Sequence, residues 1–204
     1  MDKIWKMKII DNFLTKTYHK DILELMSGET FKWCYSNNLS FSDFSKNIND
    51  YGFSHSFWDE NKGTTDEFSL LIKPLLYQIL DVTDCDLILR ARGDMVTWTG
   101  RDEFKHPAHV DYPFPNTAAV LYINETDGDT IFYNVKPNDV SKNEELKEYD
   151  RVSPKANRLI LFDGDLLHTG SSPIKYKNRI LINSNYIKNE YVEEFKIYLR
   201  NKYG

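Results

Sequence analysis

Residues 157–186 read N-R-L-I-L-F-D-G-D-L-L-H-T-G-S-S-P-I-K-Y-K-N-R-I-L-I-N-S-N-Y, and this stretch decides the fold. An apolar run, Arg158–Phe162, enters a turn at Gly164 and is followed by His168, and Arg179 then opens a second apolar run. Short apolar runs bounded by Gly and polar turn residues are typical of β-strands. The stretch therefore predicts two strands, with a histidine after the first and an arginine at the start of the second.

A second histidine, His109, stands upstream in an H-x-D motif with Asp111. Side chains alternate along a strand, so an H-x-D pair on an extended strand points both groups to one side. In a rolled sheet, His168 would reach the same point from another strand. Two imidazoles and one carboxylate can hold one face of an octahedral metal ion and leave the other positions open, which suits non-haem Fe(II). H-x-D alone also occurs by chance, so the context of His168 carries the metal hypothesis.

Arg179 follows the candidate ligand His168 at the start of its strand. A guanidinium in that place can pair with a carboxylate deep in a pocket through two parallel hydrogen bonds. The alternative is an arginine at a strand end that faces solvent, which the position relative to His168 disfavours. Asn183 shares the face of Arg179 by the period of a strand and is a further candidate pocket residue.

At these residues the chain resembles the 2-oxoglutarate/Fe(II)-dependent dioxygenases, and among them the prolyl-4-hydroxylase-like branch with its compact bacterial and phage members. The resemblance covers roughly residues 87–187 and includes T-A-A-V-L-Y-I-N (117–124) and G-D-T-I-F-Y (128–133). It implies a mainly β fold with flanking helices, the double-stranded β-helix (a cupin-like jelly roll). The run of short strands with ligands on separate strands points the same way.

The resemblance also implies roles for individual residues. His109, Asp111 and His168 would be the Fe(II) ligands, Arg179 would hold the distal carboxylate of 2-oxoglutarate, and Tyr122 would be a second contact to that carboxylate. An inward tyrosine on a strand is also common in a hydrophobic core, so the role of Tyr122 stays open.

Two departures bear on the branch. Prolyl 4-hydroxylases usually carry Lys where this chain has Arg179, so the superfamily is better supported than the branch. Nucleic-acid demethylases of the same superfamily carry a second Arg six residues after the first, where this chain has Asn185. The second departure counts against nucleobase repair.

The function implied is a hydroxylase that uses Fe(II), O2 and 2-oxoglutarate as cosubstrate. A peptidyl proline, a free amino acid and a small metabolite are all compatible substrates. One alternative is a cupin-like metal protein, an isomerase or a sensor, that does not use 2-oxoglutarate; Arg179 argues against it. Another is a metal-free binding module, against which the intact set of ligands argues.

Composition sets wider limits. The chain has 204 residues, a formal net charge of −5 and a pI near 5.6, which disfavours a partner such as nucleic acid bound over a broad surface. A local basic patch remains compatible. Cys34 and Cys85 show no pairing pattern, and lysines interrupt the apolar N-terminus, so we expect a cytoplasmic protein. We expect no membrane span, and the oligomeric state is left open.

The chain reads as one domain, 1–204. We expect residues 1–86 to give helical support, 87–187 to form the β-core and 188–204 to form a C-terminal helix. Helical spacing of apolar residues marks 18–27 and 65–80, and Pro74 predicts a kink or break in the second helix. The polar stretch 135–157 is either a solvated loop or a lid.

Several other polar residues have more than one interpretation. His106 has the wrong spacing to share a face with Asp111, and we expect it in a loop. Asp163 and Asp165 either orient the imidazole of His168 or only form its turn. The alternation along the 87–98 strand puts Arg90 and Arg92 on one face, where they either line the pocket or are exposed.

Overall fold

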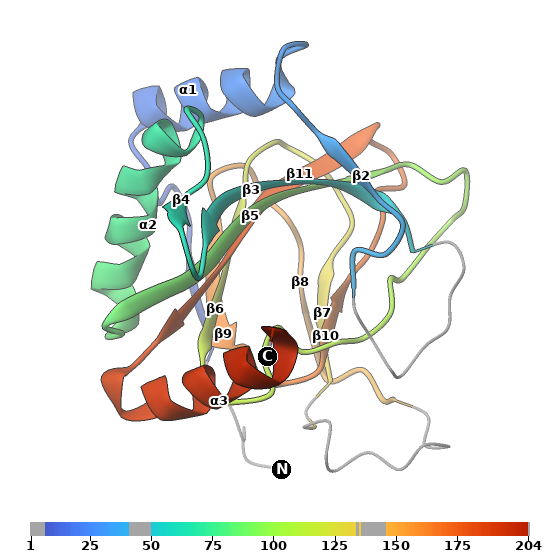
Figure 1. The fold of residues 1–204 in the computed structure, drawn as a ribbon. Helices are drawn as coiled ribbons and strands as arrows, with labels where there is room; N and C mark the ends of the chain where they lie inside the picture. The colour runs from blue at the N-terminus through green and yellow to red at the C-terminus, as the bar shows by residue number, and fades with distance from the viewer. Residues whose placement is uncertain (1–6, 41–49, 134, 136–145, 204) are drawn as a thin grey trace.

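The computed structural model describes residues 7–40, 50–133, 135 and 146–203, and these form two antiparallel sheets that face each other (Figure 1). The larger sheet has the order β1-β9-β6-β11-β5-β3-β2, with β4 paired to β3. Its strands are β1 Met7–Ile10, β2 Cys34–Ser36, β3 Gly52–Asp59, β4 Gly63–Thr64, β5 Leu87–Thr97, β6 Thr117–Tyr122, β9 Leu159–Asp163 and β11 Asn178–Ile187.

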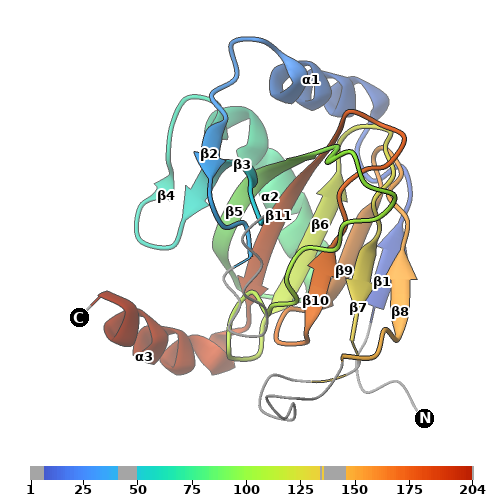
Figure 2. The same ribbon diagram turned by 90° about the vertical axis from the view of Figure 1, so that its right-hand side faces the viewer.

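The smaller sheet has the order β10-β7-β8 and covers the inner face of the larger one (Figure 2). Its strands are β7 Thr130–Phe132, β8 Asp150–Val152 and β10 His168–Gly170. The predicted double-stranded β-helix is therefore confirmed. We predicted that the stretch 135–157 is either a solvated loop or a lid. Residues 136–145 of this stretch lie outside the described residues, and β8, which lies later in it, pairs with β7.

Two helices cover the outer face of the larger sheet, α1 Lys16–Ser27 and α2 Ser69–Thr83 (Figure 1). A third, α3 Val192–Tyr203, follows the short helix η2 Asn189–Tyr191 and packs against the open end of the fold. These helices match the three predicted from apolar spacing. None of the helices in the described ranges has the length and apolar character needed to cross a bilayer.

Strand β6 shows why the two faces of the large sheet differ. Ala119 and Leu121 belong to the apolar cluster that packs under α1 and α2, while Val120 and Tyr122 belong to the cluster between the two sheets. Because side chains alternate along a strand, a nearly continuous apolar sequence here buries both faces. The central strand β11 is likewise buried along almost its whole length.

The H-x-D motif does not lie on a strand, contrary to our expectation. His109 makes only an isolated bridge to His168, and the chain bends at Asp111. The segment contains Pro107 and Pro113, and proline has no N–H to donate to a strand ladder.

Pro74 lies inside α2, and next to it the hydroxyl of Tyr18 forms hydrogen bonds with the helix backbone. The Tyr18 hydroxyl accepts from Leu75 N at 3.0 Å and donates to Leu71 O at 2.6 Å, so it bridges a pair that would otherwise bond directly in the helix. A side chain inserted into the i→i−4 ladder next to a proline is a recognised cause of helix distortion. The helix nevertheless continues through Pro74 to Thr83 without the predicted break.

We predict that Tyr18→Phe lowers the free energy of unfolding by about 1–3 kcal/mol, because it removes both hydrogen bonds of the hydroxyl, to Leu71 O and from Leu75 N, beside Pro74, which already lacks a backbone donor. Urea unfolding measures the change. The control is Tyr77→Phe on the exposed side of the same helix, which should change stability by less than about 0.5 kcal/mol. Equal stability of the two variants would contradict the bridging role.

Candidate active site

The structure brings His109, Asp111 and His168 together, with one potential ligand atom from each within 4.8 Å of the others. Asp111 lies 4.0 Å from His109 Nε2 through Oδ1 and 4.0 Å from His168 Nε2 through Oδ2. Two backbone hydrogen bonds of 2.9 Å between His109 and His168 hold the imidazoles side by side. The bond from Asp111 N to Gly164 O then ties the third residue to the turn before β10.

Each imidazole is oriented with Nε2 toward the centre of the cluster. His109 Nδ1 lies 3.2 Å from Pro107 O, and His168 Nδ1 lies 2.9 Å from Leu166 O. A carbonyl oxygen only accepts, so Nδ1 carries the proton and Nε2 keeps a lone pair for a metal ion. Backbone carbonyls thus orient both rings. From the sequence, Asp163 and Asp165 were candidates for orienting the imidazole of His168. In the structure, Leu166 O bonds Nδ1 of that ring.

The electrostatics of the cluster fit a divalent cation. Burial, with a further contribution from His168, lowers the pKa of His109 to about 4, so this imidazole is neutral at pH 7. Burial raises the pKa of Asp111, but His168 and Arg90 more than offset this and hold it well below its usual range. Neutral imidazoles and an ionised carboxylate are the forms that bind metal.

Asp111 is held by donors from the inner face of the large sheet, which sequence reasoning did not identify. Arg90 Nη2 donates to Oδ1 at 3.1 Å and Asn185 Nδ2 donates to Oδ2 at 2.9 Å. Arg90 also donates to Asn185 Oδ1 at 3.0 Å, and the two residues are directly paired across β5 and β11. Asn183 adds a longer contact of 3.4 Å. The period of the strand from Arg179 to Asn185 is the signal that could have shown the shared face.

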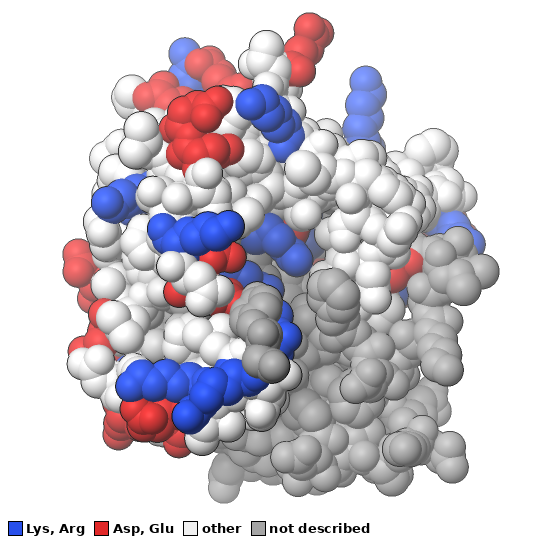
Figure 3. All heavy atoms as spheres, in the orientation of Figure 1, with Lys and Arg blue, Asp and Glu red and all other residues white. Residues whose placement is uncertain are grey.

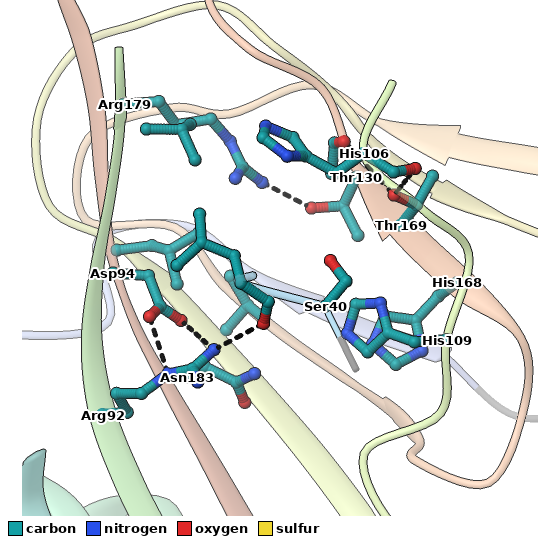
Figure 4. A pocket seen from close by; sticks show the side chains of 15 residues that line it. Ser40, Arg92, Asp94, His106, His109, Thr130, His168, Thr169, Arg179 and Asn183 are labelled. Atoms are coloured by element: carbon teal, nitrogen blue, oxygen red, sulfur yellow. Dashed lines mark hydrogen bonds and ion pairs between the residues drawn. The ribbon is translucent and has the colours of Figure 1, made fainter. Parts of the chain in front are cut away.

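Arg179 is buried, with 5% of its surface exposed, and lines the same cavity as His109 and His168 (Figure 4). Its Nη2 donates to Thr130 Oγ1 at 2.8 Å, and its guanidinium lies 5.3 Å from the centre of the Tyr122 ring. It makes no ion pair with any residue of the described ranges, and its Nε has no hydrogen-bond partner there. A buried cation without a counter-ion is costly, so the site favours an anionic ligand.

Gly170, Thr130 and Tyr122 pack closely around the guanidinium of Arg179. A Cβ at Gly170 would lie 3.1 Å from Arg179 Nη1, so a larger residue there would press the guanidinium aside by a few tenths of an ångström. Tyr122 shares a 2.7 Å hydrogen bond with Thr130 and is fully buried. Tyr122 therefore positions Thr130 and Arg179, while direct contact between Tyr122 and a cosubstrate stays a prediction.

The cavity runs between the candidate metal cluster and Arg179. His106 lines it too, but its ring nitrogens already bond Asp50 at 2.8 Å and Ser172 at 3.1 Å. It therefore lies in a loop, as expected, but it is buried there and held by these two hydrogen bonds. A second cleft adjoins the cavity and shares Leu39, Arg92 and His109 with it.

Comparison with known proteins identifies the fold. No protein-family model matches the chain, and no curated protein sequence matches it. Among solved structures, a prolyl hydroxylase of Trichoplax adhaerens in complex with a peptide fragment of the hypoxia-inducible factor oxygen degradation domain matches with a TM-score of 0.57 and 17% identity, over 90% of this chain and 84% of that one.

Two further structures match over similar lengths. A Pseudomonas putida prolyl-4-hydroxylase has a TM-score of 0.53 and 12% identity, over 92% of this chain and 94% of its own. The non-haem α-ketoglutarate-dependent epimerase SnoN of nogalamycin biosynthesis has a TM-score of 0.61 and 10% identity, over 89% and 78%. At these identities the likeness shows the fold, which is that of the 2-oxoglutarate–Fe(II) oxygenases.

We predict that Arg90→Gln and Asn185→Ala each weaken binding of Fe(II) about 10- to 100-fold, as is usual when the partners of a metal ligand are removed. Anaerobic calorimetry measures the affinity. Arg101→Gln, an exposed arginine away from the cluster, is the control and should bind like wild type. Wild-type affinity in both test variants would show that Asp111 does not need these donors.

Proposed function

We propose that this protein is a non-haem Fe(II)- and 2-oxoglutarate-dependent dioxygenase that hydroxylates a substrate C–H bond, and that the whole chain, 1–204, is one oxygenase domain. The observation that carries the proposal is the pairing of two features in one cavity. A cluster of two histidines and one aspartate lies at one end, and a buried arginine that has no counter-ion among the described residues lies at the other.

Each end of the cavity suits one part of the chemistry. His109, Asp111 and His168 would hold the metal and leave three positions open. Arg179, with Thr130 beside it, would bind the far carboxylate of 2-oxoglutarate through charge-assisted hydrogen bonds. Bound Fe(II), 2-oxoglutarate and O2 would supply the oxidative decarboxylation to succinate and CO2 that drives oxidation of the substrate.

The chain itself contributes orientation and exclusion of water. The paired donors of Arg90 and Asn185 fix the carboxylate of Asp111, so that its angle toward the metal does not change as other groups bind. The apolar residues Val120 and Leu181 line the cavity beside Arg179. Hydrogen bonds to a carboxylate are stronger in such a low-dielectric setting than in water. Asn183, which also lines the cavity, is a further candidate contact to the cosubstrate.

The two alternative functions, a cupin-like metal protein and a metal-free binding module, each leave one feature of the site unexplained. A cupin-like metal protein that does not use 2-oxoglutarate has no use for the anion site at Arg179, and a metal-free binding module has no use for the oriented imidazoles. Peptidyl proline, a free amino acid and a small metabolite remain candidate substrates. Because the similar structures include an epimerase, the product assay must detect inversion of a centre as well as hydroxylation.

The direct test is release of succinate from 2-oxoglutarate in the presence of Fe(II) and air, across a substrate panel. We predict that wild type releases succinate and that His109→Ala, Asp111→Ala and His168→Ala do not, because each removes one ligand. Asp111→Glu should fail as well, since the longer side chain displaces the carboxylate. Fe(II) binding of wild-type strength in any Ala variant would remove that residue from the ligand set.

We predict that Arg179→Ala raises the KM for 2-oxoglutarate roughly 30-fold or more, because losing one partner of a buried charge pair costs about 2–5 kcal/mol. Its affinity for Fe(II) should stay near wild type, since a guanidinium is protonated and does not ligate metal. Arg179→Lys should recover part of the loss, because it restores the charge without the planar fork. An unchanged dependence on 2-oxoglutarate in Arg179→Ala would shift support to the cupin-like alternative.

A further inference from the structure

The second cleft beside the metal cluster is basic although the protein is acidic overall. Arg90 and Arg92 of β5 and Lys202 of α3 line it, and Asp111 is the one carboxylate among the described residues of its lining, while Arg92 and Lys202 also pair with Asp94 and Glu60 behind it. Lys and Arg side chains gather in and around a hollow near the centre of this face (Figure 3). In a chain with a formal charge of −5, three cations at one cleft concentrate positive potential where a substrate would enter.

Arg92 is the cation best placed to bind a ligand. It lines both the inner cavity and the outer cleft. In the large sheet, Arg92 of β5 lies directly opposite Asn183 of β11. Asp94 fixes its guanidinium, with Asp94 Oδ1 at 2.7 Å from Nε and Asp94 Oδ2 at 3.1 Å from Nη2. Arg92 Nη1 has no hydrogen-bond partner among the described residues. Asp94 therefore holds Nε and Nη2 of the Arg92 guanidinium, while Nη1 is available to a ligand.

The other two cations have different tasks. Arg90 is committed to Asp111 and Asn185, so it holds the metal ligand. Lys202 bonds Glu60 at 3.2 Å and stands at the outer rim with 43% of its side chain exposed, where it adds positive potential at the entrance. Tyr198 and Pro113 give the cleft an apolar surface between this rim and the metal cluster.

We propose that the outer cleft is the substrate site and that it selects a substrate with an anionic group, a carboxylate or a phosphate, bound by Arg92. This inference rests on the proposed function and adds the substrate class to it. The apolar surface would receive the body of the molecule and direct a C–H bond toward His109 and Asp111. The same charges disfavour a cationic substrate group, because it would meet a guanidinium and an ammonium whose carboxylate partners, in the part of the chain that the structure describes, are already engaged.

The test uses the full chain loaded with Zn(II), which is diamagnetic and leaves nearby NMR signals visible, and 2-oxoglutarate, together with pairs of probes that differ in an anionic group. The pairs are N-acetylglycine with N-acetylglycinamide, benzoate with benzamide, and phenyl phosphate with phenol. Calorimetry gives the affinities, and the NMR signals of the arginine Nε–H groups report the place of binding. The first two pairs test a carboxylate and the third a phosphate.

The expected result is at least about tenfold tighter binding of the anion in at least one pair, with a shift of the Arg92 signal, because a hydrogen bond to a charged group contributes about 1.5–3 kcal/mol. Arg92→Gln should abolish that preference and Arg92→Lys should keep part of it. Arg92→Gln combined with Asp94→Asn removes both charges together, so it separates loss of the ligand from a buried unpaired carboxylate. Arg101→Gln is the control and should keep the preference.

Three results would overturn the inference: equal affinity within every pair, no binding by any probe, or a preference that survives in Arg92→Gln. None of these affects the proposed function, which fails separately if wild type releases no succinate from 2-oxoglutarate with Fe(II). Calorimetry of 2-oxoglutarate with the same variants adds a further check. Its affinity should be unchanged in Arg92→Gln, and a large loss there would place Arg92 in the cosubstrate site.

Discussion

The pairing of β11 with β5 is the constraint on which the site depends. In this antiparallel register Asn185 faces Arg90 and Asn183 faces Arg92, and Arg179 begins the same row at the other end of β11. A shift of one residue would turn every one of these side chains to the outer face, which packs against α1 and α2. The apolar residues that alternate with them, Ile180 and Ile182, fix the register by their burial.

The same register separates the charges by task. Arg90 stabilises the ligand Asp111, Arg92 is held by Asp94, and Arg179 has no carboxylate partner among the described residues. An arginine without a protein counter-ion attracts an anionic ligand most strongly, whereas the attraction of a paired arginine such as Arg92 is partly neutralised. Thr130 and Gly170, which come from the small sheet, complete the surroundings of Arg179. Closing the two sheets over each other thus assembles both ends of the cavity in one step.

Local patterns in the sequence were enough to predict most strands of the β-core after residue 87, the helices and the cluster of His109, Asp111 and His168. Residues 1–86, which we expected to give helical support, also supply β1–β4 to the large sheet. Alternation along 179–186 also placed Asn183 on the face of Arg179. What local patterns could not supply were contacts between residues far apart in the chain. The bond between Arg90 and Asp111, and the insertion of Tyr18 into α2, depend on how separate elements pack, which neither periodicity nor spacing encodes.

The H-x-D motif shows how a predicted cluster of residues can form without the local structure that was expected to produce it. The expected strand would have pointed both side chains to one side, yet the segment bends and only His109 is bridged to the small sheet. The two groups still converge, because His109 is held by His168 and Asp111 by the turn at Gly164, so contacts with β10 and its turn replace the strand geometry. The arrangement of the three candidate metal ligands therefore depends on residues 164–170. These residues follow the apolar run 158–162 and begin with the glycine turn, and both belong to the stretch that decides the fold.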